Sequence, residues 1–508
     1  MRARTVLASL AAVVGATLSS VAALAAPLTY EDARHLLNRT GFGATDAEIR
    51  RFVGMTREDA ARTLLAETRT APVTPPPAWT RDTGPRSYPR RGNVSETEKR
   101  AFRQEQLRKG LELRGWWLEE MLVTPSPLTE RMTLFWHNHF VSSQQKVKLA
   151  ELMYRQNVTL RTNALGTFGA LLHAVARDPA MVIYLDSARN RKGTPNENFA
   201  REVTELFTLG EGHYGEQDVK EAARAFTGWS LDRQSGQFMF RSFLHDYGPK
   251  SVLGKTGNLD GDDVLDILLA RAETAEFVTT KLWREFVSPD PDPAEVRRIA
   301  ARFRDSRYDI KVALLALLTS DAFYAPENRG ALVKSQVDLV VGTMRQFGMR
   351  PGEPVPFAVA TAAMGQNLFS PPNVKGWPGG EAWINTRTLL ARRAFLDRLF
   401  RADDAAGRTH AASAPTMVEA LVPAAAARTD DSGAARRIRL MRAMDRGLKS
   451  VQFDSEVWFG TLEAAPDTRA SAAARMLLAY APQARPDPLA EPRAQVRRIV
   501  LDAAFQLK

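Results

Sequence analysis

Five of the seven histidines in this 508-residue chain lie between residues 137 and 245, and they are the first groups that could do chemistry. His137 and His139 belong to the run Phe135–Phe140. On a helix they would point in nearly opposite directions, whereas on an extended segment they would share one face and could chelate a metal. The alternative is that one histidine packs in the core and the other caps a helix end. His139 is the candidate ligand for a divalent metal, although no HExxH-type spacing accompanies it.

A second group of polar residues falls on one face of a predicted helix. At 100° per residue, one stripe contains Asn198, Arg201, Glu202 and Glu205, beside an apolar stripe. An amide, a guanidinium and two carboxylates that converge could bind a cation or carry out acid–base chemistry. A solvent-exposed face is the alternative, in which Arg201 would bridge Glu197 and Glu205 at spacings of four residues.

Two later segments add candidate binding groups. His245 and Lys250 follow the predicted hairpin and offer an acid or ligand and an anion-binding ammonium. Lys375 and Trp377 lie in a loop, residues 369–380, that contains three prolines and three glycines. A rigid loop with an exposed tryptophan suits the wall of a binding site, and it would equally serve to end a core helix. No phosphate-binding loop, EF-hand register or Gly-x-Ser-x-Gly elbow is present.

The elements that must position these groups are predicted to be helices. Apolar residues recur at helical spacing through most of the chain, and a capping box at Ser95–Glu98 predicts a helix to about Met121. Pro127 is placed to begin the next helix. The only predicted strands are Trp229–Leu231 and Phe238–Phe240, which would form a small hairpin. The sequence therefore predicts an all-α, large multi-helix globular protein with at most a β-hairpin near residues 229–240.

The chain divides into three predicted parts. Residues 1–25 have two arginines, an apolar run and a small-x-small pattern, which is typical of a cleaved signal peptide. Residues 26–400 form a helical core that contains a Pro-rich segment, 72–92, predicted to wrap the body or to act as a lid. Residues 401–508 are predicted to form a C-terminal helical region that packs on this core.

Composition limits the classes of function. The absence of cysteine excludes disulfides, thiolate metal sites and cysteine nucleophiles. The formal charge is +11, or +9 after loss of Arg2 and Arg4 with the signal peptide. We expect a periplasmic or secreted protein with no transmembrane span after cleavage and no nucleic-acid partner, because the basic residues are interleaved with acids and no binding motif occurs.

Many of these segments resemble a bacterial family, "domain of unknown function 1800". The similarity is carried by runs of residues spread over about residues 28–400: His35–Arg39, Gly41–Gly43, Phe135–Phe140, Asn196–Glu202, Glu205–Gly210, Asp218–Val219, Ala222–Arg224, Thr227–Trp229, His245–Asp246 with Lys250 and Gly254, and Pro371–Gly380. The resemblance implies a large, mostly helical, exported protein. It also implies a companion from "domain of unknown function 1501", which is similar to sulfatases and alkaline phosphatases. Gly215 departs from the threonine common in the family at that position.

Two hypotheses of function follow. The first is a hydrolase acting on an anionic or glycan envelope polymer, with or without the assistance of a divalent metal. Its acid–base or ligand groups would be His137, Glu202, Glu205 and His245, and its substrate-binding groups Asn198, Arg201, Lys250, Lys375 and Trp377. The second is a non-catalytic helical scaffold that binds a partner enzyme or a cell-wall polymer through the Trp377 loop.

Overall fold

Helices make up most of the chain because its apolar residues recur at helical spacing and its helix starts carry capping side chains. The computed structural model describes residues 26–81, 95–232, 235–401, 416–422, 433–483, 487 and 489–508. The predicted signal peptide, residues 1–25, lies outside the described residues. The all-α prediction is confirmed. None of the helices in these ranges has the length and apolar character needed to cross a membrane.

The helices run in chain order from the N-terminal bundle through the centre to the C-terminal region: α2 (Tyr30–Thr40), α3 (Asp46–Phe52), α4 (Arg57–Ala66), α5 (Glu96–Val123), α6 (Pro127–His139), α7 (Gln144–Val147), α8 (Ala150–Asn163), α9 (Phe168–Ala176), α10 (Pro179–Tyr184), α11 (Asn198–Glu202), α12 (Glu216–Ala225), α13 (Gly261–Ala270), α14 (Ala272–Phe286), α15 (Pro293–Asp305), α16 (Ile310–Leu318), α17 (Asp321–Tyr324), α18 (Gln336–Gln346), α19 (Val355–Ala363), α20 (Thr386–Arg401), α21 (Met417–Leu421), α22 (Gly433–Lys449), α23 (Ser455–Gly460), α24 (Arg469–Leu477) and α25 (Pro492–Val500). A π-helix, Val203–Leu209, continues α11, and short 3₁₀ turns occur at Ala78–Arg81, Ser187–Arg189, Ser242–Leu244, Pro326–Asn328, Gly380–Trp383 and Ala503–Gln506.

Local signals start these helices as predicted. The side chains of Ser95 and Glu98 cap each other's backbone at the start of α5, so the predicted capping box is confirmed. Pro127 is the first residue of α6, although Ser126 before it makes no side-chain cap bond. The helix predicted to end near Met121 ends at Val123.

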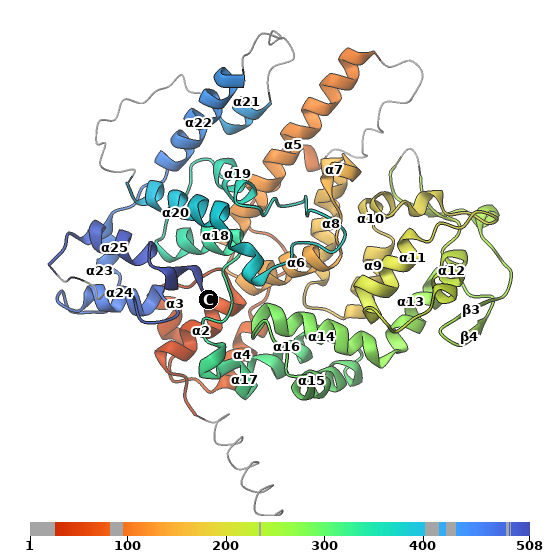
Figure 1. The fold of residues 1–508 in the computed structure, drawn as a ribbon, viewed down its shortest axis with the longest axis horizontal. Helices are drawn as coiled ribbons and strands as arrows, with labels where there is room; N and C mark the ends of the chain where they lie inside the picture. Colours follow the sequence, from red (N-terminus) through yellow and green to blue (C-terminus); the bar gives the residue numbers. More distant parts are fainter. Residues whose placement is uncertain are drawn as a thin grey trace, which may run out of the picture.

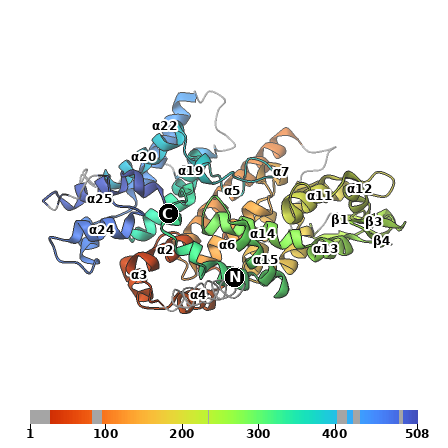
Figure 2. The same ribbon diagram turned by 60° about the horizontal axis from the view of Figure 1, so that its bottom comes forward.

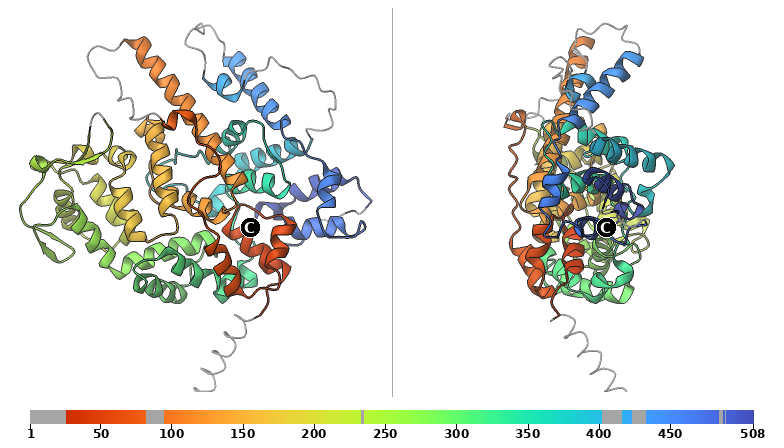
Figure 3. Two further views of the ribbon diagram at one scale, coloured as in Figure 1. Left: turned by 180° about the vertical axis from the view of Figure 1, so that it is seen from behind. Right: turned by 90° about the vertical axis from the view of Figure 1, so that its left-hand side faces the viewer.

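The helices form a broad body that is much narrower in side view (Figures 1 and 3). The C-terminal helices α23–α25 lie at one end, and α12 with the short strands lies at the other, an arrangement that Figure 2 also shows. Helix α6 runs through the middle, and α5 extends from it to meet α21. The two ends of the molecule are therefore far apart, and α6 lies between them.

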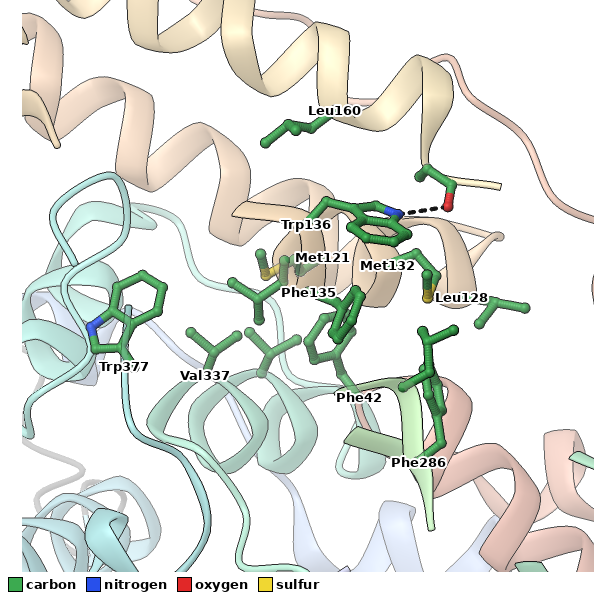
Figure 4. Close-up of a cluster of buried hydrophobic side chains, with 14 of the residues drawn as sticks. Phe42, Met121, Leu128, Met132, Phe135, Trp136, Leu160, Phe286, Val337 and Trp377 are labelled. Carbon is green, nitrogen blue, oxygen red and sulfur yellow. Dashed lines mark hydrogen bonds between the residues drawn. The ribbon is translucent and has the colours of Figure 1, made fainter. Parts of the chain in front are cut away.

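A continuous apolar core surrounds α6. Trp136 is fully buried there, and its Nε1 donates to the carbonyl of Ala164 at 2.9 Å, a bond drawn in Figure 4. Around this helix pack buried side chains from the segment after α2 and from α5, α14 and α18, including Phe42, Met121, Phe286 and Val337. The core thus fixes α6 against helices that are far apart in sequence.

The strands found among the described residues form two antiparallel two-stranded ribbons. Trp229–Leu231 (β1) pairs with Phe238–Phe240 (β2), which confirms the predicted hairpin. Lys250–Val252 (β3) pairs with Lys255–Gly257 (β4), a ribbon that the sequence did not predict. Its turn places Leu253 and Gly254 at positive φ, and leucine is not a typical turn residue there. The carboxylate of Asp218 accepts the Leu253 N–H at 2.7 Å and so holds the turn from another element.

The described part of the Pro-rich segment lies against α5. Backbone N–H groups of Val73 and Thr74 donate to the carboxylate of Glu120, and Trp79 Nε1 donates to Glu112 at 2.8 Å. Residues 82–92 of this segment lie outside the described residues. Within the described part, the wrapping interpretation fits the contacts better than a lid does.

Candidate functional site

Helix α6 directs His137 and His139 to different surroundings, as expected for residues two apart on a helix. His137 Nε2 accepts the N–H of Phe369 at 3.2 Å, and the rings of Trp117 and Trp377 lie 5.4 and 5.7 Å away. Burial, together with the charge of Arg114, lowers the pKa of His137 to about 3. The ring is therefore neutral, and it anchors the loop that begins at Phe369.

His139 is bound at both ring nitrogens. Its Nε2 lies 3.1 Å from the carbonyl oxygen of Phe207, to which it donates, and its Nδ1 accepts from Nζ of Lys281 at 3.1 Å. Burial and the charge of Lys281 hold the pKa of His139 well below its usual range. Neither nitrogen remains open to a metal. In the part of the chain that the structure describes, no three His, Cys, Asp or Glu side chains form a group that could hold an ion.

Lys281 is a residue that sequence reasoning missed. It lies on α14, and its ammonium also donates to the carbonyl of Leu206 at 3.0 Å and lies 4.6 Å from the centre of the Phe277 ring. Burial and the nearby charge of Arg284 lower the pKa of Lys281 to about 8. An amine with a pKa in this range is suited to proton transfer near neutral pH.

Lys281 and His139 both face a cleft of about 440 Å³, which we call the basic cleft. Its walls come from α6, α14, the start of α18 and the loop around Trp377. The charged residues that line it are Arg131, Lys281, Arg284, Lys375 and Lys508, which are basic, and Glu285 and Asp338, which are acidic. Five basic groups against two acidic ones give the cleft an excess of three positive charges.

The two acidic residues of the basic cleft are already paired with cations. Asp338 is bound by Arg131 and by Nζ of Lys508 at 2.8 Å, and Glu285 lies 3.3 Å from Arg131. Burial would raise the pKa of Asp338, but the charges and hydrogen bonds of Arg131 and Lys508 outweigh it and hold that pKa far below its usual range. Lys281 and Arg284 are left without a carboxylate partner among the described residues. Lys375 has only the exposed Glu211, at 3.4 Å.

The loop around Trp377 forms one wall of the basic cleft, but the tryptophan ring itself is buried. Trp377 is only 4% exposed, so the prediction of an exposed ring is wrong. Asn138 on α6 holds the loop: its Oδ1 accepts the Trp377 N–H at 2.7 Å, and its Nδ2 donates to the Trp377 carbonyl. Gly376 sits at φ +83° against Asn138, where a side chain would collide. The prolines and glycines therefore fit a loop closely packed on α6.

The predicted stripe on α11 is interrupted by the π-helix, which changes the angle between successive residues after Glu202. Arg201 pairs with Glu197 at 3.1 Å and with Glu216 at 2.7 Å, so the predicted bridge to Glu205 is wrong. Glu205 instead accepts the hydroxyl of Tyr214. The side-chain amide of Asn198 donates to the carbonyl of Leu185 at 3.3 Å and so links α11 to the segment after α10.

Glu202 is the least constrained member of this stripe. It is half-buried, and burial together with the charge of Glu205 raises its pKa, while Arg201 and Lys375 oppose the shift. Lys375 thus acts electrically on Glu202 and also lines the basic cleft. Glu202 precedes the π-helix and Glu205 lies within it, and neither lines the basic cleft; Lys281 and His139 bind the carbonyls of Leu206 and Phe207 in the same π-helix.

His245 and Lys250 lie elsewhere, near the ribbons at one end of the molecule (Figure 1). His245 is buried, and its Nδ1 lies 2.8 Å from the carbonyl of Thr227, to which it donates. Lys250 donates to the carbonyl of Gly248 at 3.1 Å, and burial lowers its pKa. The predicted residues therefore fall into four places: the cleft wall with His139, Lys375 and Trp377, the core behind Phe369 with His137, the α11 stripe, and the ribbons.

The sequence held a weak signal for the missed residues. Arg131 is followed directly by Met132, and Lys281 by Leu282 and Trp283. A basic residue beside buried apolar ones needs a partner, which marks it as worth testing. The partners, however, lie between 75 and 207 residues away in the chain.

Comparison with known proteins adds a family but no activity. The family model described as "Protein of unknown function (DUF1800)" matches residues 35–483. Comparison with curated proteins and with solved structures finds no match.

Proposed function

The chain belongs to the DUF1800 family, and for this member we propose an enzyme that binds an anionic glycan polymer in the basic cleft and cleaves it. The observation that carries the proposal is the unbalanced charge of the cleft: Lys281, Arg284 and Lys375 face a pocket whose acids are already paired. A cleft of a few hundred Å³ fits one or two sugar units.

The walls of the basic cleft also suit a sugar. Trp377, Trp383 and Phe135 are among the residues that line it. Apolar and aromatic walls with a few polar groups are the usual make-up of small-ligand sites. Charge-assisted hydrogen bonds from Lys and Arg would then select acidic sugars over neutral ones.

The proposal includes the cell compartment and a partner. The pattern of residues 1–25 supports export, and an envelope polymer would be the substrate in the periplasm or outside the cell. A companion of the sulfatase and alkaline-phosphatase type would remove sulfate or phosphate groups from the same kind of polymer.

Binding measurements test the proposal. The chain without residues 1–25 is titrated with polygalacturonate, alginate, chondroitin sulfate and, as the neutral control, dextran. We expect affinity for an acidic polymer that falls as salt is added and no affinity for dextran. Arg284→Ala combined with Lys375→Ala should weaken binding about tenfold or more, since two charge-assisted contacts are lost.

Lys255→Ala is the matched control, because Lys255 is an exposed lysine on β4, outside the basic cleft. The proposal is contradicted if Lys255→Ala lowers polymer affinity as much as the double substitution does, or if the double substitution leaves the affinity unchanged. The scaffold hypothesis shares the binding step and differs in cleavage: retained binding with no shortening of any polymer favours the scaffold.

A further inference from the structure

The basic cleft lacks the groups that two-carboxylate glycoside hydrolysis needs. That mechanism requires a protonated carboxylic acid beside the leaving oxygen and a second carboxylate as base or nucleophile. Among the described residues that line the cleft, the carboxylates are Glu285 and Asp338, and both contact the guanidinium of Arg131. The cations around Asp338 hold its pKa far below its usual range, so it has no proton to give, and Glu285 is engaged by the same guanidinium.

Lys281 has the geometry of a base instead. A neutral amine has two N–H bonds and one lone pair. The two hydrogen bonds of Lys281, to the carbonyl of Leu206 at 3.0 Å and to His139 Nδ1 at 3.1 Å, account for both N–H bonds. The lone pair is then left to take a proton. Burial and Arg284 favour this neutral form by lowering the pKa of Lys281.

Arg284 lies one helical turn after Lys281 on α14 and also lines the basic cleft. Its side chain is exposed, and it pairs with no carboxylate among the described residues. Lys375 faces the same space from the opposite loop. A carboxylate bound by these two cations would lie in the same cleft as the Lys281 amine.

We propose that the basic cleft cleaves a 4-linked uronate polymer by β-elimination, with Lys281 as the base and Arg284 and Lys375 binding the uronate carboxylate. This inference rests on the proposed function and names its substrate class and its reaction.

The reaction balances with no further reactant. Nζ of Lys281 removes the proton from C5, which the neighbouring carboxylate acidifies, and the electron pair of that C–H bond passes into an enediolate. Cations beside the carboxylate stabilise this developing charge. The C4–O bond then breaks, its electrons go to the leaving oxygen, and that oxygen takes the proton back from Lys281. One product carries a C4=C5 double bond, the other a new hydroxyl, and no water is consumed.

The reaction products distinguish β-elimination from hydrolysis. The chain without residues 1–25 is incubated with polygalacturonate, alginate and chondroitin in ¹⁸O-labelled water. Elimination is expected to give the ultraviolet absorbance of a conjugated unsaturated uronate and no ¹⁸O at the new chain ends. Shortened polymer that carries ¹⁸O and lacks this absorbance overturns the elimination while leaving the proposed function standing.

Variants separate the role of Lys281 from stability. Lys281→Arg keeps a cation that can bind the Leu206 carbonyl but supplies no base near neutral pH; it should retain polymer affinity and lose at least about a hundredfold in kcat. Lys255→Arg is the control and should keep full turnover. The inference is overturned if Lys281→Arg keeps its kcat, or if all three uronate polymers bind tightly and none is cleaved. If none of them binds, the proposed function is overturned as well.

Discussion

At the scale of single residues, burial decides which titratable groups carry a charge. His137 and His139 are neutral because the helices enclose them, and the buried Lys281 is held by two acceptors. These charge states follow from contacts between α6, α14 and the π-helix. They cannot be deduced from the residue types alone.

Asp178 provides a residue-scale prediction on pH. Its carboxylate caps α10 through the N–H groups of Ala180 and Met181, and burial raises its pKa to about 7. The folded chain therefore keeps a proton that the unfolded chain releases above about pH 4. Stability from this group falls as pH rises from about 4 to about 7, by an amount on the order of a few kcal/mol.

Asp178→Asn removes the titration while keeping an acceptor for the cap. The free energy of unfolding, measured by urea at several pH values, should decline less between pH 4 and 7 in the variant than in the parent chain. Asp309→Asn, at the partly exposed cap of α16, is the control and should track the parent. Parallel curves for Asp178→Asn and the parent chain would rule out this assignment.

At the scale of elements, the Trp377 loop depends on its fit to α6. A Cβ at Gly376 would lie 2.3 Å from Oδ1 of Asn138 and 2.7 Å from its carbonyl oxygen, at a φ of +83°. Gly376→Ala should therefore destabilise the chain by about 1–3 kcal/mol more than backbone strain alone, since an overpacked contact must open. Anionic-polymer affinity should fall with it, because the same loop walls the basic cleft.

Gly379→Ala separates strain from collision. Gly379 also has positive φ, +72°, but nothing lies within 4 Å of its added Cβ. Thermal unfolding of the two variants is compared under identical conditions. If Gly376→Ala and Gly379→Ala lower the unfolding temperature equally, the close contact between the loop and Asn138 does not contribute to stability.

At the scale of the whole molecule, one buried carboxylate ties distant segments together. Asp338 at the start of α18 binds Arg131 on α6 and Lys508. Asp338→Asn removes the buried carboxylate shared by the two cations and leaves them only the longer contacts with Glu285, at 3.3 Å from Arg131 and 3.9 Å from Lys508. It should lower the free energy of unfolding by about 3–5 kcal/mol in a urea titration.

Asp321→Asn is the matched control. Asp321 forms an exposed pair with Arg57 at 2.7 Å, and exposed pairs contribute about 1 kcal/mol or less. A loss no larger for Asp338→Asn than for Asp321→Asn would show that the buried network does not hold the body together.

Much of the fold could be predicted from the sequence, because helix starts and apolar spacing are local properties. Ser95 and Pro127 mark their helices, and the residues between β1 and β2 mark the hairpin. The ribbon β3–β4 escaped prediction because its turn is held by Asp218 from another element. The predicted signal peptide, the companion protein and the export of the chain stay predictions.

The site was harder to predict because its parts meet only in three dimensions. The sequence motifs identify His139, Lys375 and Trp377. Lys281 and Arg284 lie on α14, whose apolar spacing is that of any amphipathic helix and does not mark a site. The carbonyls of Leu206 and Phe207 in the π-helix are bound by Lys281 and His139 from other helices, contacts that residues 203–209 alone do not reveal. Trp377 appeared exposed because proline and glycine around it usually mark surface loops.

The last residue of the chain has a consequence for the order of assembly. Lys508 reaches the basic cleft, and residues 332–334 form backbone hydrogen bonds with residues 506–508. Ribosomes deliver residues in order, so α6 and α14 emerge hundreds of residues before the side chain that completes their charge network. Until then Asp338 lacks one of its two cations. The charge network of the basic cleft is thus completed only after residue 508 has been synthesised, long after α6 and α14.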